Sequence, residues 1–157
     1  MSEKPHWSQA SPQWWEAWPL PKSEAPRVDA GEVMRLLEQQ PTERDFLLVD
    51  VRRSDWEGGA ITTSINLPAH AFYQSRGMVY DLCRRANIKR IIFFCRSSNG
   101  RGPRCAAWMQ DYISEADGGS GGGLEAVVMD GGVSGWAKTY GGRMMDWYDE
   151  DHWKGVA

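Results

Sequence analysis

The chain has 157 residues, a formal net charge of −3 and an isoelectric point of about 5.6. It is long enough for one domain with its own core, and its charge gives no basic footprint for nucleic acid. It has no apolar run long enough to span a membrane, and its first residues lack the pattern of a secretory signal. The three cysteines have no metal-ligand spacing and are expected to be free thiols. These features predict a cytoplasmic or nuclear protein with no metal and no membrane or nucleic-acid partner.

The composition divides the chain into three regions. Residues 1–26 form an arm rich in tryptophan and proline, with four tryptophans among the first eighteen residues. We expect these indoles to pack on the domain surface because aromatic clusters bury large areas, and a recognition segment for a partner is the alternative. Residues 27–140 form the main domain, and residues 141–157 form an acidic, aromatic tail.

Helical and strand patterns alternate through the main domain. Asp29, with Glu32 three positions later, predicts the start of a helix over residues 30–39. Residues 46–49 and 90–94 are continuous apolar runs, typical of central strands that are covered on both faces. Further strands are expected at 61, 64–68 and 124–129, and further helices at 80–86, from 102 onwards, and at 133–139. This alternation predicts an α/β fold with a mostly parallel sheet flanked by helices.

The segment after the strand at 90–94 carries the predicted chemistry. Cys95 is followed by a short polar loop, Arg101 and a helix. The start of a helix offers unpaired N–H groups, and a small polar loop can turn its own N–H groups inward to bind an anion. Arg101 adds a planar cation suited to an oxyanion. We therefore expect Cys95 to be a thiolate nucleophile in an anion-binding ring, with a buried structural cysteine as the alternative.

Three stretches carry a family resemblance. LLVDVRRSDWEGGAITTSINLP and VVMDGGVSGW resemble the N- and C-terminal signatures of rhodanese-like domains. CRSSNGRGPR resembles the active loop of the branch that holds the M-phase inducer phosphatases and the fungal-type arsenate reductases. The seven residues 95–101 are one more than sulfur-transferring rhodaneses have in this loop. The resemblance spans residues 27–140 and implies a single rhodanese-like domain.

The resemblance also implies roles for individual residues. Cys95 would be the nucleophile and Arg101 the oxyanion ligand. The remaining loop residues would supply backbone N–H groups: Arg96, Ser97, Ser98, Asn99 and Gly100. The chain departs from the family at Phe94 and Ala60, where histidine is usual, and at Val51, where the phosphatases have a second cysteine.

The expected activity is that of a Cys-x5-Arg enzyme acting on arsenate or on phosphate esters, phosphoproteins included. No tightly bound cofactor is implied, and glutathione with a glutaredoxin would reduce the enzyme if arsenate is the substrate. A thiosulfate sulfurtransferase and a non-catalytic binding module are the alternatives.

Proton donors and resolving thiols are harder to place. The loop contains no carboxylate, so the candidate general acids are acidic residues elsewhere: Asp130, Asp146, Asp149, Glu150 and Asp151. Cys83 and Cys105 are expected to be core residues rather than resolving thiols. His6, His70 and His152 are too scattered for a metal site, and none is an evident partner of Cys95.

Overall fold

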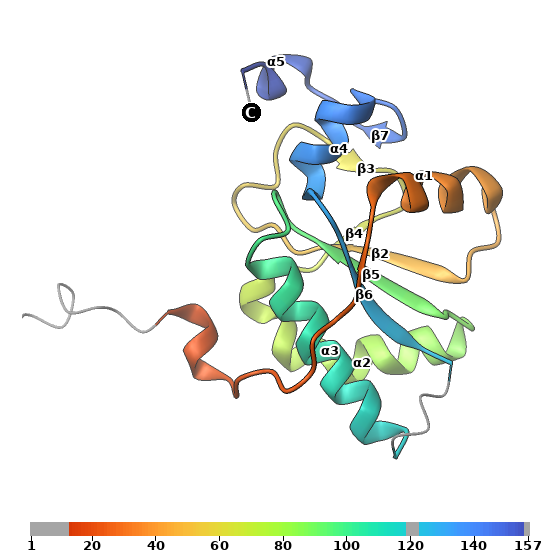
Figure 1. Ribbon diagram of the computed structural model, residues 1–157, viewed down its shortest axis with the longest axis vertical. Helices are drawn as coiled ribbons and strands as arrows, with labels where there is room; N and C mark the ends of the chain where they lie inside the picture. The colour runs from red at the N-terminus through yellow and green to blue at the C-terminus, as the bar shows by residue number, and fades with distance from the viewer. Residues whose placement is uncertain (1–12, 119–122, 156–157) are drawn as a thin grey trace, which may run out of the picture.

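The computed structural model describes residues 13–118 and 123–155. Five parallel strands form the central sheet: β1 (Arg27–Val28), β2 (Phe46–Asp50), β4 (Ile65–Asn66), β5 (Arg90–Phe94) and β6 (Glu125–Met129). Their order across the sheet is β1-β6-β5-β2-β4, which puts β5 in the middle (Figure 1). The predicted α/β fold with a parallel sheet is confirmed. The glycine-rich stretch at 119–122 lies outside the described residues.

Helices cover both faces of the sheet. Helices α2 (Ala69–Arg85) and α3 (Arg101–Ala116) lie on one face, and α1 (Ala30–Gln39) and α4 (Gly132–Tyr140) lie on the other (Figure 1). Side chains alternate across a strand, so Phe93 joins the core under α2 and α3 while Phe94 joins the core under α1 and α4. Burial on both faces explains why β2 and β5 are continuous apolar runs.

Helix α2 begins eleven residues earlier than its sequence pattern predicted, at Ala69 instead of residue 80. Its buried stripe consists of Ala69, Phe72, Val79 and Cys83. Gly77 interrupts this pattern because α2 approaches α3 closely there: a Cβ at Gly77 would lie 3.0 Å from the hydroxyl of Tyr112.

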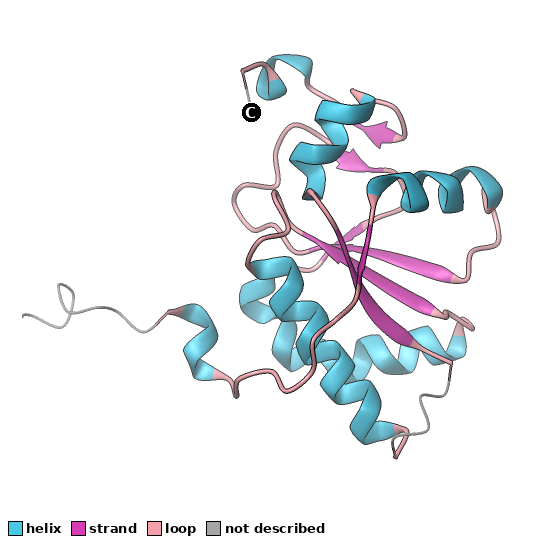
Figure 2. Cartoon of the chain, viewed as in Figure 1, coloured by secondary structure: helices cyan, strands magenta, loops and turns pink. Residues whose placement is uncertain are grey.

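The C-terminal segment packs against the turn that follows β2. Strand β3 (Ala60–Ile61) pairs antiparallel with β7 (Met145–Asp146), and the short helix α5 (Glu150–Trp153) follows. The indole nitrogen of Trp153 donates to the carbonyl of Gly58 at 2.8 Å, and the N–H of Asp149 donates to the same carbonyl at 3.1 Å. Figure 2 shows this group of elements together at one end of the molecule.

The described part of the arm lies along α2 and α3. It contains the 3₁₀ helix η1 (Trp14–Ala17). Trp14 meets Trp108 of α3 edge-on at 5.9 Å, and Trp18 stacks on Tyr73 of α2 at 4.8 Å. The arm's indoles therefore pack on the domain from Trp14 onwards, whereas Trp7 lies outside the described residues.

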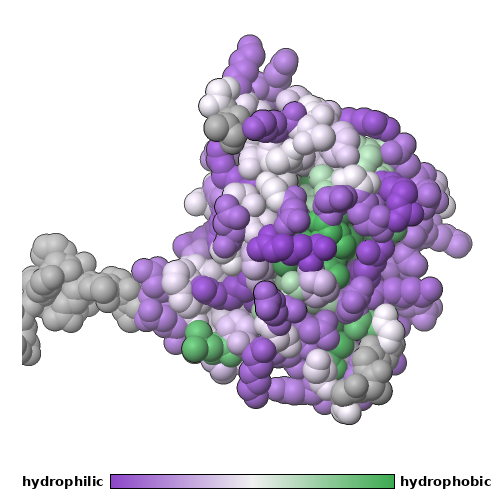
Figure 3. Space-filling model, in the orientation of Figure 1, coloured by the Kyte–Doolittle hydropathy of each residue, from purple (hydrophilic) through white to green (hydrophobic). Residues whose placement is uncertain are grey.

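The surface on the side shown in Figure 3 is mostly hydrophilic, with apolar residues visible between the polar ones. No described helix is both long and apolar enough to cross a lipid bilayer. Within residues 13–118 and 123–155, no group of three or more histidine, cysteine or acidic side chains could hold a metal ion.

Candidate active site at the carboxyl end of β5

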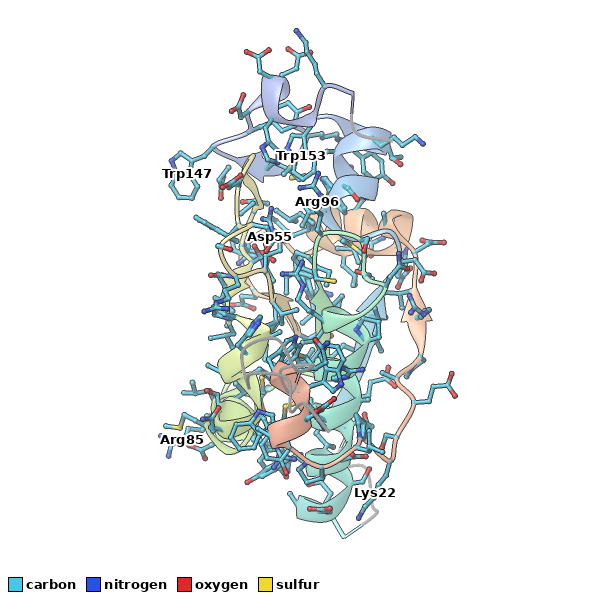
Figure 4. The ribbon with its side chains drawn as sticks, turned by 90° about the vertical axis from the view of Figure 1, so that its left-hand side faces the viewer. Lys22, Asp55, Arg85, Arg96, Trp147 and Trp153 are labelled. Carbon is cyan, nitrogen blue, oxygen red and sulfur yellow. The ribbon has the colours of Figure 1, made fainter. Side chains whose placement is uncertain are left out.

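The candidate site lies where β2 and β5 end side by side. Asp50, the last residue of β2, is in register with Phe94, the last residue of β5. Cys95 follows β5 directly, and Arg101 is the first residue of α3. We call residues 95–101 the active loop and residues 53–57, which follow β2, the rim turn. Parallel sheets bind ligands beyond this edge of their strands. Figure 4 looks onto this edge and labels Asp55 of the rim turn and Arg96 of the active loop.

The sulfur of Cys95 points into the active loop. Its Sγ accepts hydrogen bonds from the N–H of Ser98 at 3.2 Å and from the N–H of Gly102 at 3.4 Å. The residue is only 2% exposed. Two backbone N–H groups, one from within the loop and one from the residue after it, are therefore aimed at one sulfur.

Ser98 gives the loop its inward turn. It is fully buried and has a left-handed backbone, with φ of 59°. This conformation lets successive N–H groups face inward, as in anion-binding nests. Its hydroxyl oxygen is buried and has no hydrogen-bond partner among the residues that the structure describes. It is therefore a polar group inside the loop that a bound oxyanion could engage.

The other predicted loop residues lie further out. Ser97, Asn99 and Gly100 are exposed, and Arg96 is half-buried. The guanidinium of Arg96 lies 5.6 Å from the ring centre of Trp153 in α5 (Figure 4). Arg96 thus links the active loop to the C-terminal segment.

The start of α4 supports the base of the loop. The carbonyl of Cys95 accepts from the N–H of Val133 at 3.0 Å, and the carbonyl of Arg96 accepts from the N–H of Ser134 at 2.9 Å. This close approach requires glycine at position 132, where φ is +60° and a Cβ would lie 2.4 Å from both carbonyl oxygens. The Gly-Gly pair of the C-terminal signature therefore fixes the active loop.

Arg101 is held by a carboxylate that sequence reasoning missed. Its two terminal nitrogens donate to the two oxygens of Asp55 at 2.7 and 2.6 Å. The hydrogen bond from Arg101 holds the pKa of Asp55 well below its usual range. Arg101 also lies close enough to Cys95 to interact with the sulfur. A signal for Asp55 was present, because it follows the carboxyl end of a central strand beside β5.

A buried ion pair shapes the rim turn. Arg52 and Asp50 are both fully buried and joined at 2.7 Å. Arg52 also donates to the carbonyls of Glu57 and Gly59, each at 2.9 Å. A buried guanidinium needs this full set of acceptors, so the rim turn that carries Asp55 has a fixed path.

The five carboxylates that the sequence suggested as general acids are paired, capping or exposed side chains in the structure. Asp130 pairs with Arg27 at 2.8 Å and is about half exposed. The side chain of Asp149 caps α5. Asp146 is an exposed residue of β7, and Glu150 and Asp151 are exposed residues of α5. The structure pairs Asp55 with Arg101, and within the described residues it gives none of these five a hydrogen bond or ion pair with a side chain of the active loop.

Cys83 and Cys105 are buried free thiols, as expected of core residues. Burial raises the pKa of Cys83 to about 11. Burial also raises the pKa of Cys105, and the nearby charge of Cys95 adds to that rise. Both are poor nucleophiles at neutral pH.

His70 lies in the first turn of α2, near the rim turn. Its ring packs on that of Trp14 with centroids 4.6 Å apart. Burial lowers its pKa, the positive charges of Arg53 and Arg101 lower it further, and the carboxylate of Asp55 opposes them. The sequence showed no link between His70 and Cys95 because the two are joined only through the sheet.

A parallel α/β sheet whose central strand leads into a cysteine-to-arginine loop, supported by a Gly-Gly turn, is the arrangement that the sequence signatures predicted for a rhodanese-like domain. The rhodanese-like domain signature matches residues 29–139, so the chain belongs to that family, as the sequence predicted. The chain is 28% identical over 115 residues to Arsenical-resistance protein 2 of Saccharomyces cerevisiae, a match that covers 69% of this chain and 85% of the relative.

Solved structures agree with this assignment. A yeast protein tyrosine phosphatase of the rhodanese family, Ygr203w, superposes with a TM-score of 0.68 at 25% identity, covering 84% of this chain and 99% of that one. A second structure of Ygr203w describes it as a homologue of single-domain rhodanese and of the Cdc25 phosphatase catalytic domain. An As–Sb reductase of Leishmania major has a TM-score of 0.64 at 21% identity, with 74% of this chain and 79% of that one covered, and shows the shared fold alone. The relatives thus include the branch that the active loop indicated.

Proposed function

We propose that the chain is an enzyme in which the Cys95 thiolate attacks a tetrahedral oxyanion, reducing arsenate and hydrolysing phosphate esters with good leaving groups. The observation that carries this proposal is the active loop itself. The Cys95 sulfur receives two backbone N–H groups from Ser98 and Gly102, and Arg101 lies beside it. Donors placed in advance around a charged centre are the main source of transition-state stabilisation in such reactions.

With arsenate, the Cys95 sulfur would displace water and form a sulfur–arsenic bond. Glutathione would then attack the sulfur, so that the electron pair of that bond stays with arsenic and reduces As(V) to As(III). The product disulfide between Cys95 and glutathione would be reduced by a glutaredoxin. An external thiol is needed because Cys83 and Cys105 are buried with raised pKa values.

With a phosphate ester, the same attack would give a cysteinyl phosphate that water hydrolyses. The kind of ester that can react depends on whether the site has a group that can protonate the leaving group. Asp55 is the carboxylate paired with Arg101, and its pKa lies well below the usual range, so it is ionised at neutral pH and has no proton to donate. General acids contribute about 10²–10⁴-fold to such steps, so esters that need a protonated leaving group should react slowly.

Two relatives support this pair of substrates. Arsenical-resistance protein 2 is named for arsenic resistance, and Ygr203w is described as a protein tyrosine phosphatase. One preparation of the protein tests the proposal. We expect turnover of arsenate with glutathione and glutaredoxin, slower turnover of para-nitrophenyl phosphate, and loss of both in Cys95→Ser. Turnover of thiosulfate and cyanide alone would show a sulfurtransferase instead. Absence of all three activities would favour a binding module.

A further inference from the structure

The proposed reaction lacks a proton acceptor. Hydrolysis of the cysteinyl phosphate requires a group that takes a proton from the attacking water. Both oxygens of Asp55 are engaged by Arg101. The acceptor must therefore be another group with an unused lone pair, and His70 has one at its Nδ1 atom.

Hydrogen bonds across the sheet place His70 beside the active loop. The carbonyl of Phe94, the residue before Cys95, accepts from the N–H of Val51 at 2.9 Å. The carbonyl of Val51 accepts from the N–H of Ala69, the residue before His70, at 3.0 Å. Two strand spacings therefore separate the two chain segments, which is roughly 10 Å. The charges of Arg101 and Asp55 act on the His70 ring, so the imidazole lies on the side of the site where this ion pair sits.

The imidazole is held by the arm. Its ring lies against that of Trp14 at an interplanar angle of 31°. Trp14 is fixed in turn by Trp108, whose indole nitrogen donates to the carbonyl of Pro19 at 2.8 Å. Asp111 of α3 accepts the N–H groups of both Lys22 and Ser23 at 2.8 Å. Figure 4 shows η1 on the same face of the molecule as Asp55 and Arg96.

One nitrogen of the imidazole makes no hydrogen bond with the residues that the structure describes. The Nδ1 atom of His70 is buried and has no hydrogen-bond partner among residues 13–118 and 123–155. A buried polar atom without a partner calls for an explanation, and a catalytic role is one of the few available. Stacking on Trp14 covers a face of the ring and makes no hydrogen bond to this nitrogen.

The surrounding charges favour a neutral imidazole. The charged groups that face it are Arg53 and Asp55 of the rim turn and Arg101 of α3. The arm contributes the uncharged indole of Trp14. Burial and the two arginines keep the pKa of His70 below its ordinary value, so at neutral pH the ring is unprotonated and has a lone pair that can take a proton.

We propose that His70 is the general base of the second half-reaction and that Trp14 of the N-terminal arm is its positioning residue. The inference rests on the proposed function of Cys95. In the step, the O–H bond of water breaks and its proton passes to the imidazole. An oxygen–phosphorus bond forms as the phosphorus–sulfur bond breaks, and the electron pair of that bond returns to the Cys95 sulfur. The imidazolium then loses its proton to solvent.

Pre-steady-state kinetics of His70→Gln with para-nitrophenyl phosphate test the role directly. We expect the burst of nitrophenolate from the first half-reaction to remain and the steady rate after it to fall about 10²-fold, within the usual range for a general base. A steady rate equal to that of the wild type, or equal loss of both phases in a folded variant, would overturn the assignment.

Two arm variants separate Trp14 from a general effect of the arm. The wild-type steady rate should fall at acid pH as His70 is protonated. Trp14→Ala should expose the imidazole and raise its pKa. The fall of the rate on the acid side of the pH profile, the acid limb, should then begin at higher pH. Trp18→Ala removes an indole of equal size that stacks on Tyr73 instead, and should leave the limb in place. A shift of the same size in both variants would contradict the role of Trp14.

Binding measured by NMR keeps this inference separate from the proposed function. Adding inorganic phosphate should shift the amide signals of the active loop and the ring signals of His70 together. Loop shifts without a His70 shift would retain the oxyanion site and reject His70. No shift in either would reject the oxyanion site on which both proposals rest.

Discussion

Asp55 holds Arg101 through both of its carboxylate oxygens, at 2.7 and 2.6 Å, and so presents a negative charge beside the ring that should receive an oxyanion. The two anions compete for one guanidinium. In Asp55→Asn this competition and the repulsion disappear, so inorganic phosphate should bind several-fold more tightly. A gain of at least about 1 kcal/mol is expected, which is the repulsion of two unit charges about 4 Å apart at the dielectric constant of water.

Isothermal titration with inorganic phosphate in a Cys95→Ser background measures this effect without turnover. Asp151→Asn is a suitable control, because its carboxylate is exposed and pairs with Lys154 in α5. Weaker phosphate binding in Asp55→Asn would show that Asp55 orients Arg101 for the ligand rather than competing with it.

The same pair gives a pH dependence of stability. The pKa of Asp55 is lowered in the folded protein from an ordinary value of 3.8. A lowered pKa stabilises the fold above the ordinary value, and this contribution is lost as the pH falls below it. The pair is partly exposed, with 25% and 33% of its side chains accessible, so its contribution should not exceed about 1 kcal/mol.

Urea unfolding of the wild type and of Asp55→Asn from pH 6 to pH 2 measures that contribution. The difference in unfolding free energy should be steady above pH 4 and shrink as the pH falls. A difference that grows towards acid pH would have the wrong sign for an ionised Asp55.

The support of the active loop by α4 predicts an unequal response to two glycine substitutions. Gly132→Ala places a Cβ against the carbonyls of Cys95 and Arg96 at a positive φ, so it should displace the loop. We expect a loss of about 1–3 kcal/mol in stability and most of the activity. Gly135→Ala, in the same helix with open space around it, should gain up to about 1 kcal/mol and keep the activity. Thermal unfolding and arsenate turnover of the two variants provide the comparison. Equal losses of stability and activity in Gly132→Ala and Gly135→Ala would contradict the role of Gly132 in supporting the active loop.

Thiol labelling distinguishes the three cysteines. Cys83 has a pKa of about 11, and Cys105 is completely buried with a raised pKa, so both should stay unmodified in the folded protein at pH 8. Iodoacetamide should label Cys95 first, and inorganic phosphate should slow that labelling. Peptide mass spectrometry reports the modified position. Faster labelling of Cys83 or Cys105 than of Cys95 would contradict the assignment of the nucleophile.

The sequence predicted those parts of the fold that depend on local patterns. The apolar runs of β2 and β5 and the cap at Asp29 lie where expected, and the Asp29 side chain accepts from the N–H of Glu32 at 2.8 Å. Helix α2 was predicted too short because Gly77 serves a contact with α3, which a local pattern does not contain. Leu82 is 55% exposed although it is apolar, since the buried stripe of α2 passes through the neighbouring Cys83.

The candidate site divides in the same way. Cys95, Arg101 and the loop between them are contiguous, so the motif and its resemblance could indicate them. Asp55 and His70 reach the site from β2 and β4 across the sheet, through parallel pairing that fixes which strand ends meet. The sequence instead suggested a proton donor among the acidic residues near the C-terminus. In the structure, Asp149 caps α5, and Asp146, Glu150 and Asp151 are exposed to solvent.

A crystal structure of Cys95→Ser with arsenate tests the central claim most directly. The account predicts one arsenate inside residues 95–101, with its oxygens within hydrogen-bond distance of the Ser98 and Gly102 N–H groups and of the Arg101 guanidinium. An active loop that excludes arsenate at saturating concentration, while Arg101 remains bound to Asp55, would contradict it.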